Sequence, residues 1–231
     1  MIPILHRNSS LANQELNWHP TDAEELYQQN LKKNLAELQR YNWVGRPITY
    51  KFNNYGFRAD EFDSPGSNVM LLGCSHTLGV GLPVESTWAH IVSTALKLKN
   101  YNLSIGGTSN DTVFRMAYHW INQLNPDLVI FLSGPRTRVE LHTINNQIED
   151  LSIHANGYSK NFMQQWAGNV INGDMNYLKN MLAIKQLCNE GRIKFLHEEL
   201  RNILPIDKAR DLQHYGEITH RRIAAMFLGR L

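Results

Sequence analysis

A nearly continuous apolar run at 127–132, Asp-Leu-Val-Ile-Phe-Leu, most constrains the fold of this 231-residue chain. Such a run is typical of a parallel strand that is buried on both faces of a sheet. A second apolar run, at 69–72, and a strand-like segment at 193–197 are each separated from it by stretches with helical patterning. The alternation of strands and helices predicts an α/β domain in which helices cover both faces of a parallel sheet.

The same patterns predict the order of the elements and a division of the chain. We expect strands at about 48–52, 69–72, 101–103, 127–132 and 193–197. We expect helices at about 21–41, 86–98, 109–124, 175–189 and 215–228. The Asn- and Gly-rich stretch at 145–172 is expected to be a loop or an insertion. Residues 1–65 are interpreted as an N-terminal extension (arm, helix and short strand) and residues 66–231 as the α/β domain.

Composition excludes several classes of function. Apolar residues make up 42% of the chain and charged residues 19%, as in an ordinary soluble globular protein. A net charge of +2, with no basic run interleaved with aromatic residues, gives no reason to expect a nucleic-acid partner. Cys74 and Cys188 are the only cysteines, and no histidines pair at metal-ligand spacing. We therefore expect no metal and no cofactor.

The sequence shows no targeting or membrane segment. Its first residues lack the apolar stretch of a signal peptide, and no run approaches the roughly 18 apolar residues of a membrane helix. We expect a cytoplasmic protein without a membrane partner. Oligomerisation and association with a larger particle, such as a virion, are left open.

A serine and an Asp–His pair carry the chemical signal. Ser75 follows the apolar run at 69–72 and is flanked by small residues, so it is expected on a tight turn that exposes its hydroxyl. Asp211 and His214 lie near the other end of the chain, three residues apart. A serine nucleophile needs a base, and the base needs a carboxylate to fix its tautomer. The chain offers all three in the order Ser, Asp, His.

Three loops are expected to meet at one edge of the sheet. Ser75 follows one predicted strand, Gly106-Gly107 follows the next, and the segment 133–136 follows a third. In an open parallel sheet, ligands bind outside the carboxyl ends of the strands. The loop with Asp211 and His214 has to reach the same edge for a triad to form.

Three sequence blocks resemble those of the SGNH (GDSL-like) hydrolase family. The first is Gly-Cys-Ser-His-Thr at 73–77, in which Cys74 replaces the usual Asp. The second is Asn-Leu-Ser-Ile-Gly-Gly at 102–107, and the last is Asp-Leu-Gln-His at 211–214. The resemblance implies a flavodoxin-like α/β/α fold and hydrolysis of esters, including acetylated sugars and lipids. It also implies that Ser75 is the nucleophile, His214 the base and Asp211 its orienting carboxylate.

The third block of the family is not matched. The resemblance implies that the backbone amides of Ser75 and Gly107 bind the oxyanion, assisted by an Asn that follows the third strand. In this chain Pro135 stands where that Asn is expected, and proline donates no hydrogen bond. Asn110 and Arg136 are the nearest candidate donors. A structural salt bridge explains Arg136 equally well.

These features favour a serine esterase that acts on a small acyl group, with an O-acetyl ester on a carbohydrate as the specific expectation. Its expected partner is then a small-molecule or glycan ester. Two alternatives stay open. One is an O-acyltransferase, which uses the same serine chemistry with an alcohol in place of water. The other is a binding or structural module that keeps the fold without turnover, which the proline at 135 favours. The segment at 50–58 is similar to one found ahead of this domain in phage-encoded and microbial members.

Overall fold

A computed structural model describes residues 6–62, 67–143, 147–152 and 158–231 of the chain. Its centre is a parallel sheet of four strands in the order β4-β3-β5-β8. The strands are β3 (Asn68–Leu72), β4 (Lys99–Asn102), β5 (Leu128–Ser133) and β8 (Lys194–Glu199). All residues of β3 and β5 are buried, which confirms the interpretation of the two apolar runs as central strands.

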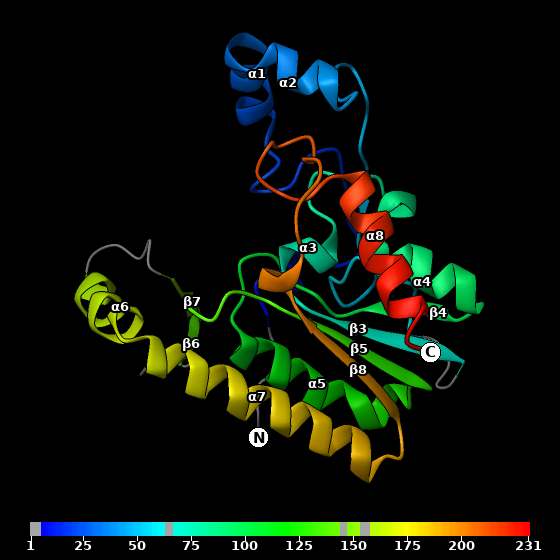
Figure 1. Cartoon of the computed structure of the whole chain (residues 1–231), viewed down its shortest axis with the longest axis vertical. Coiled ribbons are helices and arrows are strands. Elements are labelled where there is room, and N and C mark those ends of the chain that lie inside the picture. Colours follow the sequence, from blue (N-terminus) through cyan, green and yellow to red (C-terminus); the bar gives the residue numbers. More distant parts are fainter. Residues whose placement is uncertain (1–5, 63–66, 144–146, 153–157) are drawn as a thin grey trace.

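Helices cover both faces of the sheet, as Figure 1 shows. On one face lie α4 (Trp88–Leu96) and α8 (Glu217–Leu228), which share one apolar core with the sheet. On the other face lie α5 (Asn110–Leu124) and α7 (Val170–Glu190), which share a second core with it. The predicted three-layer α/β/α architecture is confirmed.

The connections that follow β3 and β5 turn to opposite faces of the sheet. The chain leaves β3 through α3 (Ser75–Leu78) and η2 (Val84–Ser86) toward α4, whereas it leaves β5 toward α7. A crevice opens where neighbouring connections diverge in this way, at the carboxyl ends of the strands. The fold therefore places Ser75, directly after β3, at the position where this architecture binds ligands.

Two predictions of local structure need correction. The single helix expected at 21–41 is two helices, α1 (Glu24–Lys33) and α2 (Leu35–Arg40), because Asn34 leaves the helical conformation between them. Of the two alternatives expected for 145–172, a loop or an insertion, the loop is wrong: the stretch contains β7 (Ile148–Leu151), paired with β6 (Val139–His142), and also α6 (Tyr158–Gly168) and the start of α7. Its Asn and Gly residues partly serve as helix ends: the Asn169 side chain caps α7 by accepting from the Ile171 backbone N–H.

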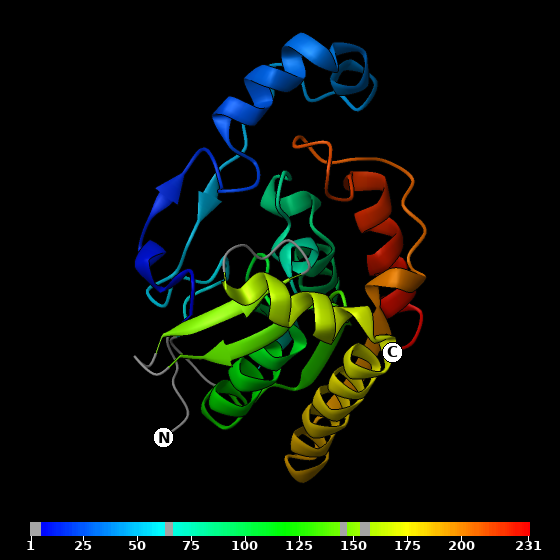
Figure 2. The ribbon, with the colours of Figure 1, turned by 90° about the vertical axis from the view of Figure 1, so that its left-hand side faces the viewer.

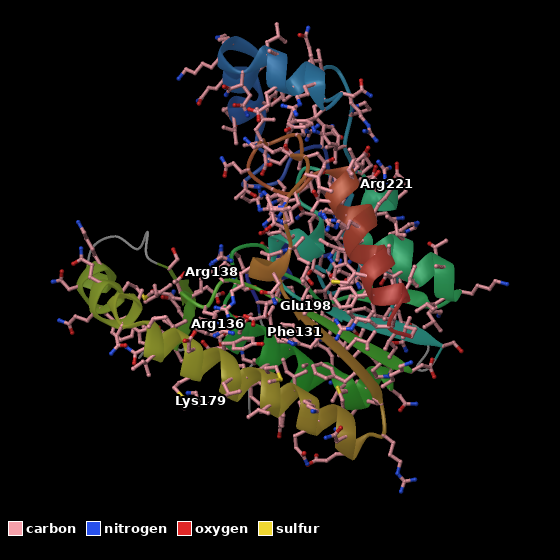
Figure 3. All side chains as sticks on the ribbon, in the orientation of Figure 1. Phe131, Arg136, Arg138, Lys179, Glu198 and Arg221 are labelled. Atoms are coloured by element: carbon pink, nitrogen blue, oxygen red, sulfur yellow. The ribbon has the colours of Figure 1, made fainter. Side chains whose placement is uncertain are left out.

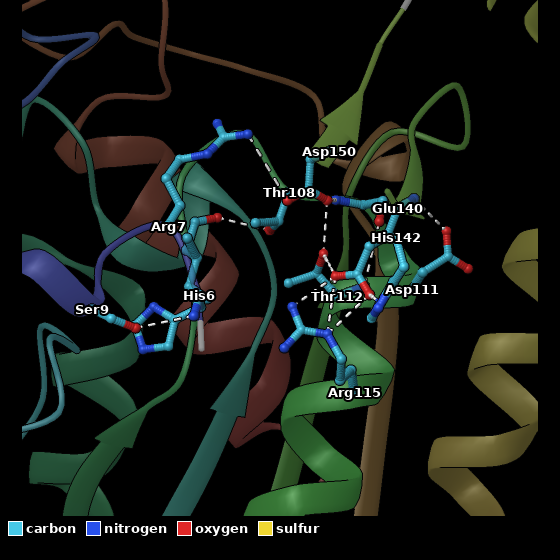
Figure 4. A network of polar contacts seen from close by, with 12 residues as sticks. His6, Arg7, Ser9, Thr108, Asp111, Thr112, Arg115, Glu140, His142 and Asp150 are labelled. Atoms are coloured by element: carbon cyan, nitrogen blue, oxygen red, sulfur yellow. Dashed lines mark hydrogen bonds and ion pairs between the residues drawn. The ribbon is translucent and has the colours of Figure 1, made fainter. Parts of the chain in front are cut away.

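The β6–β7 hairpin is attached to the first turns of α5 by buried polar groups (Figure 4). Arg115 and Glu140 form a buried ion pair 2.7 Å apart. The Thr112 hydroxyl lies 2.6 Å from Glu140 Oε2 and 2.7 Å from Asp150 Oδ1. Asp150 also accepts from the Ser109 backbone N–H. The hairpin thereby fixes the N-terminal end of α5, which carries Asn110.

The N-terminal residues, 6–62 in the described part of the chain, pack onto the loops of the α/β domain (Figures 1 and 2). They form η1 (Ser9–Leu11) and a two-stranded antiparallel pair, β1 (Glu15–Leu16) with β2 (Tyr50–Lys51), in addition to α1 and α2. Their apolar side chains form a third core with residues that follow α3 and with Ala209. Among the described helices, none is long and apolar enough to cross a membrane.

Candidate active site

The turn that carries Ser75 is set by the glycine before it. A Cβ at Gly73 would lie 2.1 Å from Thr77 Oγ1 and 2.8 Å from the Leu132 carbonyl oxygen, so only glycine fits here. Cys74 continues in an extended conformation, and Ser75 is the first residue of α3. Ser75 is 6% exposed, and its hydroxyl makes no hydrogen bond within the described part of the chain. The hydroxyl is therefore available to a base.

Asp211 and His214 contact one another as the sequence predicts. Asp211 Oδ2 accepts a hydrogen bond from His214 Nδ1, and Asp211 Oδ1 accepts from the backbone N–H groups of Gln213 and His214, both at 3.0 Å. The Asp211 side chain is fully buried, whereas that of His214 is 12% exposed. Because Nδ1 donates to the carboxylate, Nε2 of the neutral ring is a proton acceptor. This is the arrangement that a general base requires.

The turn with Ser75 and the loop with His214 lie against each other. The ring of His76, next to Ser75, packs 4.2 Å from Tyr215 and 4.9 Å from His214, measured between ring centroids. Burial lowers the pKa of His76 well below its usual value, and the nearby His214 lowers it further. His76 is thus a neutral packing neighbour of the His214 loop. Ser75 and His214 form no direct hydrogen bond here, and such bonds often close only when substrate is bound.

Asn110 stands beside the loop in which Pro135 replaces the expected donor. Its Oδ1 accepts from the backbone N–H of Gly134 at 3.2 Å. Since a backbone N–H needs an acceptor, this bond fixes which end of the amide is oxygen. The other end, Nδ2, has no partner among the residues that the structure describes, and it is not sealed from solvent. Asn110 therefore presents a fixed, unused donor at this edge of the sheet.

The backbone N–H of Gly107 is another expected donor to the oxyanion. Gly107 has a φ of +77°, a conformation that favours glycine. A Cβ at this position would lie 2.7 Å from Nη1 of Arg7. His19 approaches the neighbouring Gly106, where its Cε1 lies 3.2 Å from the position of a Cβ. Both Arg7 and His19 belong to the N-terminal residues. Sequence reasoning missed them because they stand alone in a weakly patterned segment without a motif.

Arg136 is occupied by carboxylates. Its guanidinium contacts Glu199 at 2.7 Å and Asp174 at 2.5 Å and stacks over the ring of Tyr177 at 3.8 Å. These ion pairs raise its pKa against the opposing effect of burial. Figure 3 shows Arg136 beside α7, past the carboxyl end of β5. The geometry matches the salt-bridge interpretation rather than a free donor for an oxyanion.

A small pocket borders this edge of the sheet. Its volume is about 170 Å³, and it is lined by the loop at 134–136, by η3 (Leu200–Asn202) and by Tyr215, the residue after His214. Within the described ranges, no group of three or more His, Cys, Asp or Glu side chains could hold a metal ion. The side chains assembled here are those of acid–base and nucleophilic chemistry.

Comparisons with known proteins give structural likeness only. No family model matches the chain, and no curated protein matches it. Solved structures similar to it include TesA, at 12% identity over 70% of this chain and 96% of that one, with a TM-score of 0.39. Another is the esterase EstA from Pseudoalteromonas sp., at 12% identity over 71% of this chain and 95% of that one, with a TM-score of 0.35.

An acetyl xylan esterase, Est2A from Butyrivibrio proteoclasticus, is also similar. It is 12% identical over 73% of this chain and 63% of that one, with a TM-score of 0.38. Other similar structures are described as GDSL-like lipases. Because identities and TM-scores are this low, the chemistry of this chain has to be argued from its own side chains.

Proposed function

We propose that this protein is a serine esterase in which Ser75, His214 and Asp211 form the catalytic triad. The observation that carries the proposal is the geometry of Asp211, which is fully buried and hydrogen-bonded to Nδ1 of His214. The loop that holds this pair is packed against the turn that holds Ser75. A base with an oriented tautomer beside a serine without another partner is the constellation that activates a hydroxyl.

In the proposed reaction, His214 Nε2 accepts the proton of the Ser75 hydroxyl as Ser75 Oγ attacks the ester carbonyl. Asp211 stabilises the imidazolium that forms. His214 then donates that proton to the departing alcohol, which leaves an acyl group on Ser75. Water, deprotonated by His214, attacks this acyl-enzyme and releases the acid and the free serine. The cycle needs neither a metal nor a cofactor.

Three donors are available for the negative charge on the carbonyl oxygen. Two are the backbone N–H groups of Ser75 and Gly107, and neither donates a hydrogen bond elsewhere in the described ranges. The third is Nδ2 of Asn110. We propose that Asn110 replaces the donor that Pro135 cannot supply, because its amide is anchored on Gly134, in the same loop. Preorganised donors of this kind act most strongly on charge that develops in the transition state.

The proposed substrate is an ester of a small acyl group, with an O-acetyl carbohydrate as the specific candidate. Transfer of the acyl group to an alcohol uses the same residues and remains the alternative within this chemistry. A binding module without turnover is favoured by one observation, the lack of a direct Ser75–His214 hydrogen bond.

Hydrolysis of p-nitrophenyl esters of increasing chain length tests the proposal. We expect turnover of the acetate ester, a lower kcat/KM for the octanoate ester, and loss of activity in Ser75→Ala. Ser133→Ala is the control, since Ser133 is also a buried serine and is the last residue of the central strand β5. Equal rates in Ser75→Ala and the unaltered protein would refute the proposal. Release of p-nitrophenol that needs an added alcohol, with the acetyl group transferred to that alcohol and no acetate released, would instead identify a transferase.

A further inference from the structure

We infer that Tyr50 and Asp22, from the N-terminal residues, are positioning residues. They fix the position of the Ser75 turn relative to the Asp211–His214 loop. Neither residue contacts the catalytic side chains directly. They act through the backbone of Gly81 and through the side chain of Arg210. The inference rests on the proposed function and extends it to a part of the chain that has no catalytic motif.

The contacts form a closed ring. The Gly81 backbone N–H donates to Tyr50 Oη at 2.8 Å, and Tyr50 Oη donates to Asp22 Oδ2 at 2.6 Å. Asp22 accepts from Nη2 of Arg210 at 2.7 Å and from its Nε at 3.1 Å. The Arg210 backbone N–H then donates to the Gly81 carbonyl at 3.1 Å. The ring joins the loop after α3 to the residue that precedes Asp211.

Burial makes this ring costly to break. Tyr50 is 0% exposed, Asp22 1% and Arg210 3%. Removing the Tyr50 hydroxyl would leave the Gly81 N–H without its acceptor and Asp22 without one of its donors, away from water. A buried polar group that loses its partner bears the full cost of its desolvation. We therefore expect the two loops to shift so that these groups regain partners.

A shift at Gly81 would reach the catalytic serine through the backbone. The N–H groups of Gly79 and Val80 both donate to the Ser75 carbonyl, at 3.0 and 3.1 Å. Gly81 also packs directly on the other loop, since a Cβ there would lie 2.8 Å from Cβ of Ala209. Movement of Gly81 relative to Arg210 thus changes the position of Ser75 relative to His214.

A second set of contacts from the N-terminal residues holds the loop after α3. Arg58, which is 3% exposed, donates to the carbonyl oxygens of Gly79 at 2.8 Å and Leu82 at 2.9 Å. Its guanidinium lies over the Tyr50 ring at 4.5 Å. The carbonyl of Asp211 itself accepts from Asn30 Nδ2 at 3.4 Å. The N-terminal residues therefore hold both loops, and the Tyr50–Asp22 pair connects one loop to the other through buried side chains.

The test compares Tyr50→Phe with Tyr27→Phe. Each variant loses one hydroxyl with two hydrogen bonds, but those of Tyr27 join it to the Trp43 carbonyl and the Gly45 N–H, neither of which belongs to the Ser75 turn or to the Asp211–His214 loop. We expect Tyr50→Phe to lower the rate of modification of Ser75 by a fluorophosphonate about 10-fold to 100-fold, since small misplacements of reacting groups have effects of this size. We expect its kcat on p-nitrophenyl acetate to fall with little change in KM, and both quantities to stay within about twofold in Tyr27→Phe.

Two further measurements keep the test decisive. If Tyr50→Phe does not fold, as judged by circular dichroism, Asp22→Asn replaces it, because it keeps the shape and one acceptor while removing the charge that Arg210 pairs with. Amide hydrogen exchange of residues 75–82 and 206–216 separates this inference from the proposed function. Faster exchange of both segments in Tyr50→Phe alone supports positioning even if the unaltered protein does not react. An unchanged modification rate in Tyr50→Phe, or equal losses in both variants, would overturn the inference.

Discussion

At the scale of single residues, the proposed site combines an ordinary Ser, His and Asp set with an unusual proposed source of oxyanion stabilisation. Pro135 stands where a donor is expected, and Asn110 presents its Nδ2 from the N-terminal end of α5 instead. The hydrogen bond from Gly134 orients the amide, so the donor needs no reorganisation during the reaction. Of the two candidate donors named from the sequence, Asn110 is the better placed, because Arg136 is held by Glu199 and Asp174.

Asn110→Asp tests this assignment selectively. The aspartate keeps an oxygen that can accept from the Gly134 N–H, but it presents a second oxygen where Nδ2 was. We expect kcat for a p-nitrophenyl ester to fall by about 10²–10³, the usual cost of losing one oxyanion donor, with little change in the melting temperature. Steady-state kinetics beside thermal unfolding measures both quantities. A variant of normal stability that retains most of its kcat would show that Asn110 does not bind the oxyanion.

The sequence was sufficient to identify the candidate site residues that lie within motifs, but not those that lie outside them. The spacing of Asp211 and His214 predicted a contact that the structure contains, whereas the catalytic roles of both residues stay predictions. His19, Asp22 and Tyr50 could not be assigned to the site from the sequence. Each is a single polar or aromatic residue whose importance arises from contacts with loops far along the chain, and no local pattern records such contacts.

At the scale of elements, hydrophobic periodicity identified the central sheet. The runs at 69–72 and 127–132 became β3 and β5 because residues buried on both faces have to be apolar throughout. For the stretch at 145–172 the loop alternative was wrong, because its Asn and Gly residues resemble those of loops. In the structure, Glu140 and Asp150 bind the hairpin to α5 through Thr112 and Arg115. Such buried polar pairing is decided by tertiary structure and is not visible as a local pattern.

At the scale of the whole molecule, the N-terminal residues and the α/β domain share both an apolar core and a set of buried polar groups. Among the buried groups are His19 and His220, which are 6% and 1% exposed. Burial lowers the pKa of His19 from 6.5 to about 4 and that of His220 to about 3. Both histidines are therefore neutral in the folded protein at pH values where the unfolded chain begins to protonate them.

This difference predicts a loss of stability on mild acidification. Between pH 6.5 and pH 4 the unfolded chain binds protons at these two positions that the folded chain does not bind, so the free energy of unfolding falls as pH falls. Each such histidine contributes a slope of about 1.4 kcal/mol per pH unit. Urea unfolding at pH 6 and pH 5 measures the slope. His19→Gln is expected to reduce it by about 1.4 kcal/mol per pH unit, the contribution of one proton. An unchanged slope in His19→Gln would show that His19 is not held neutral.

The central claim is that His214 and Asp211 activate Ser75, and intact-mass detection of a fluorophosphonate adduct on the purified protein tests it most directly. The account predicts one adduct per chain, which is absent in Ser75→Ala and forms much more slowly in His214→Ala. Peptide mapping should place the adduct on Ser75. A folded protein that forms no adduct, or forms it as fast in His214→Ala as in the unaltered chain, would contradict the account.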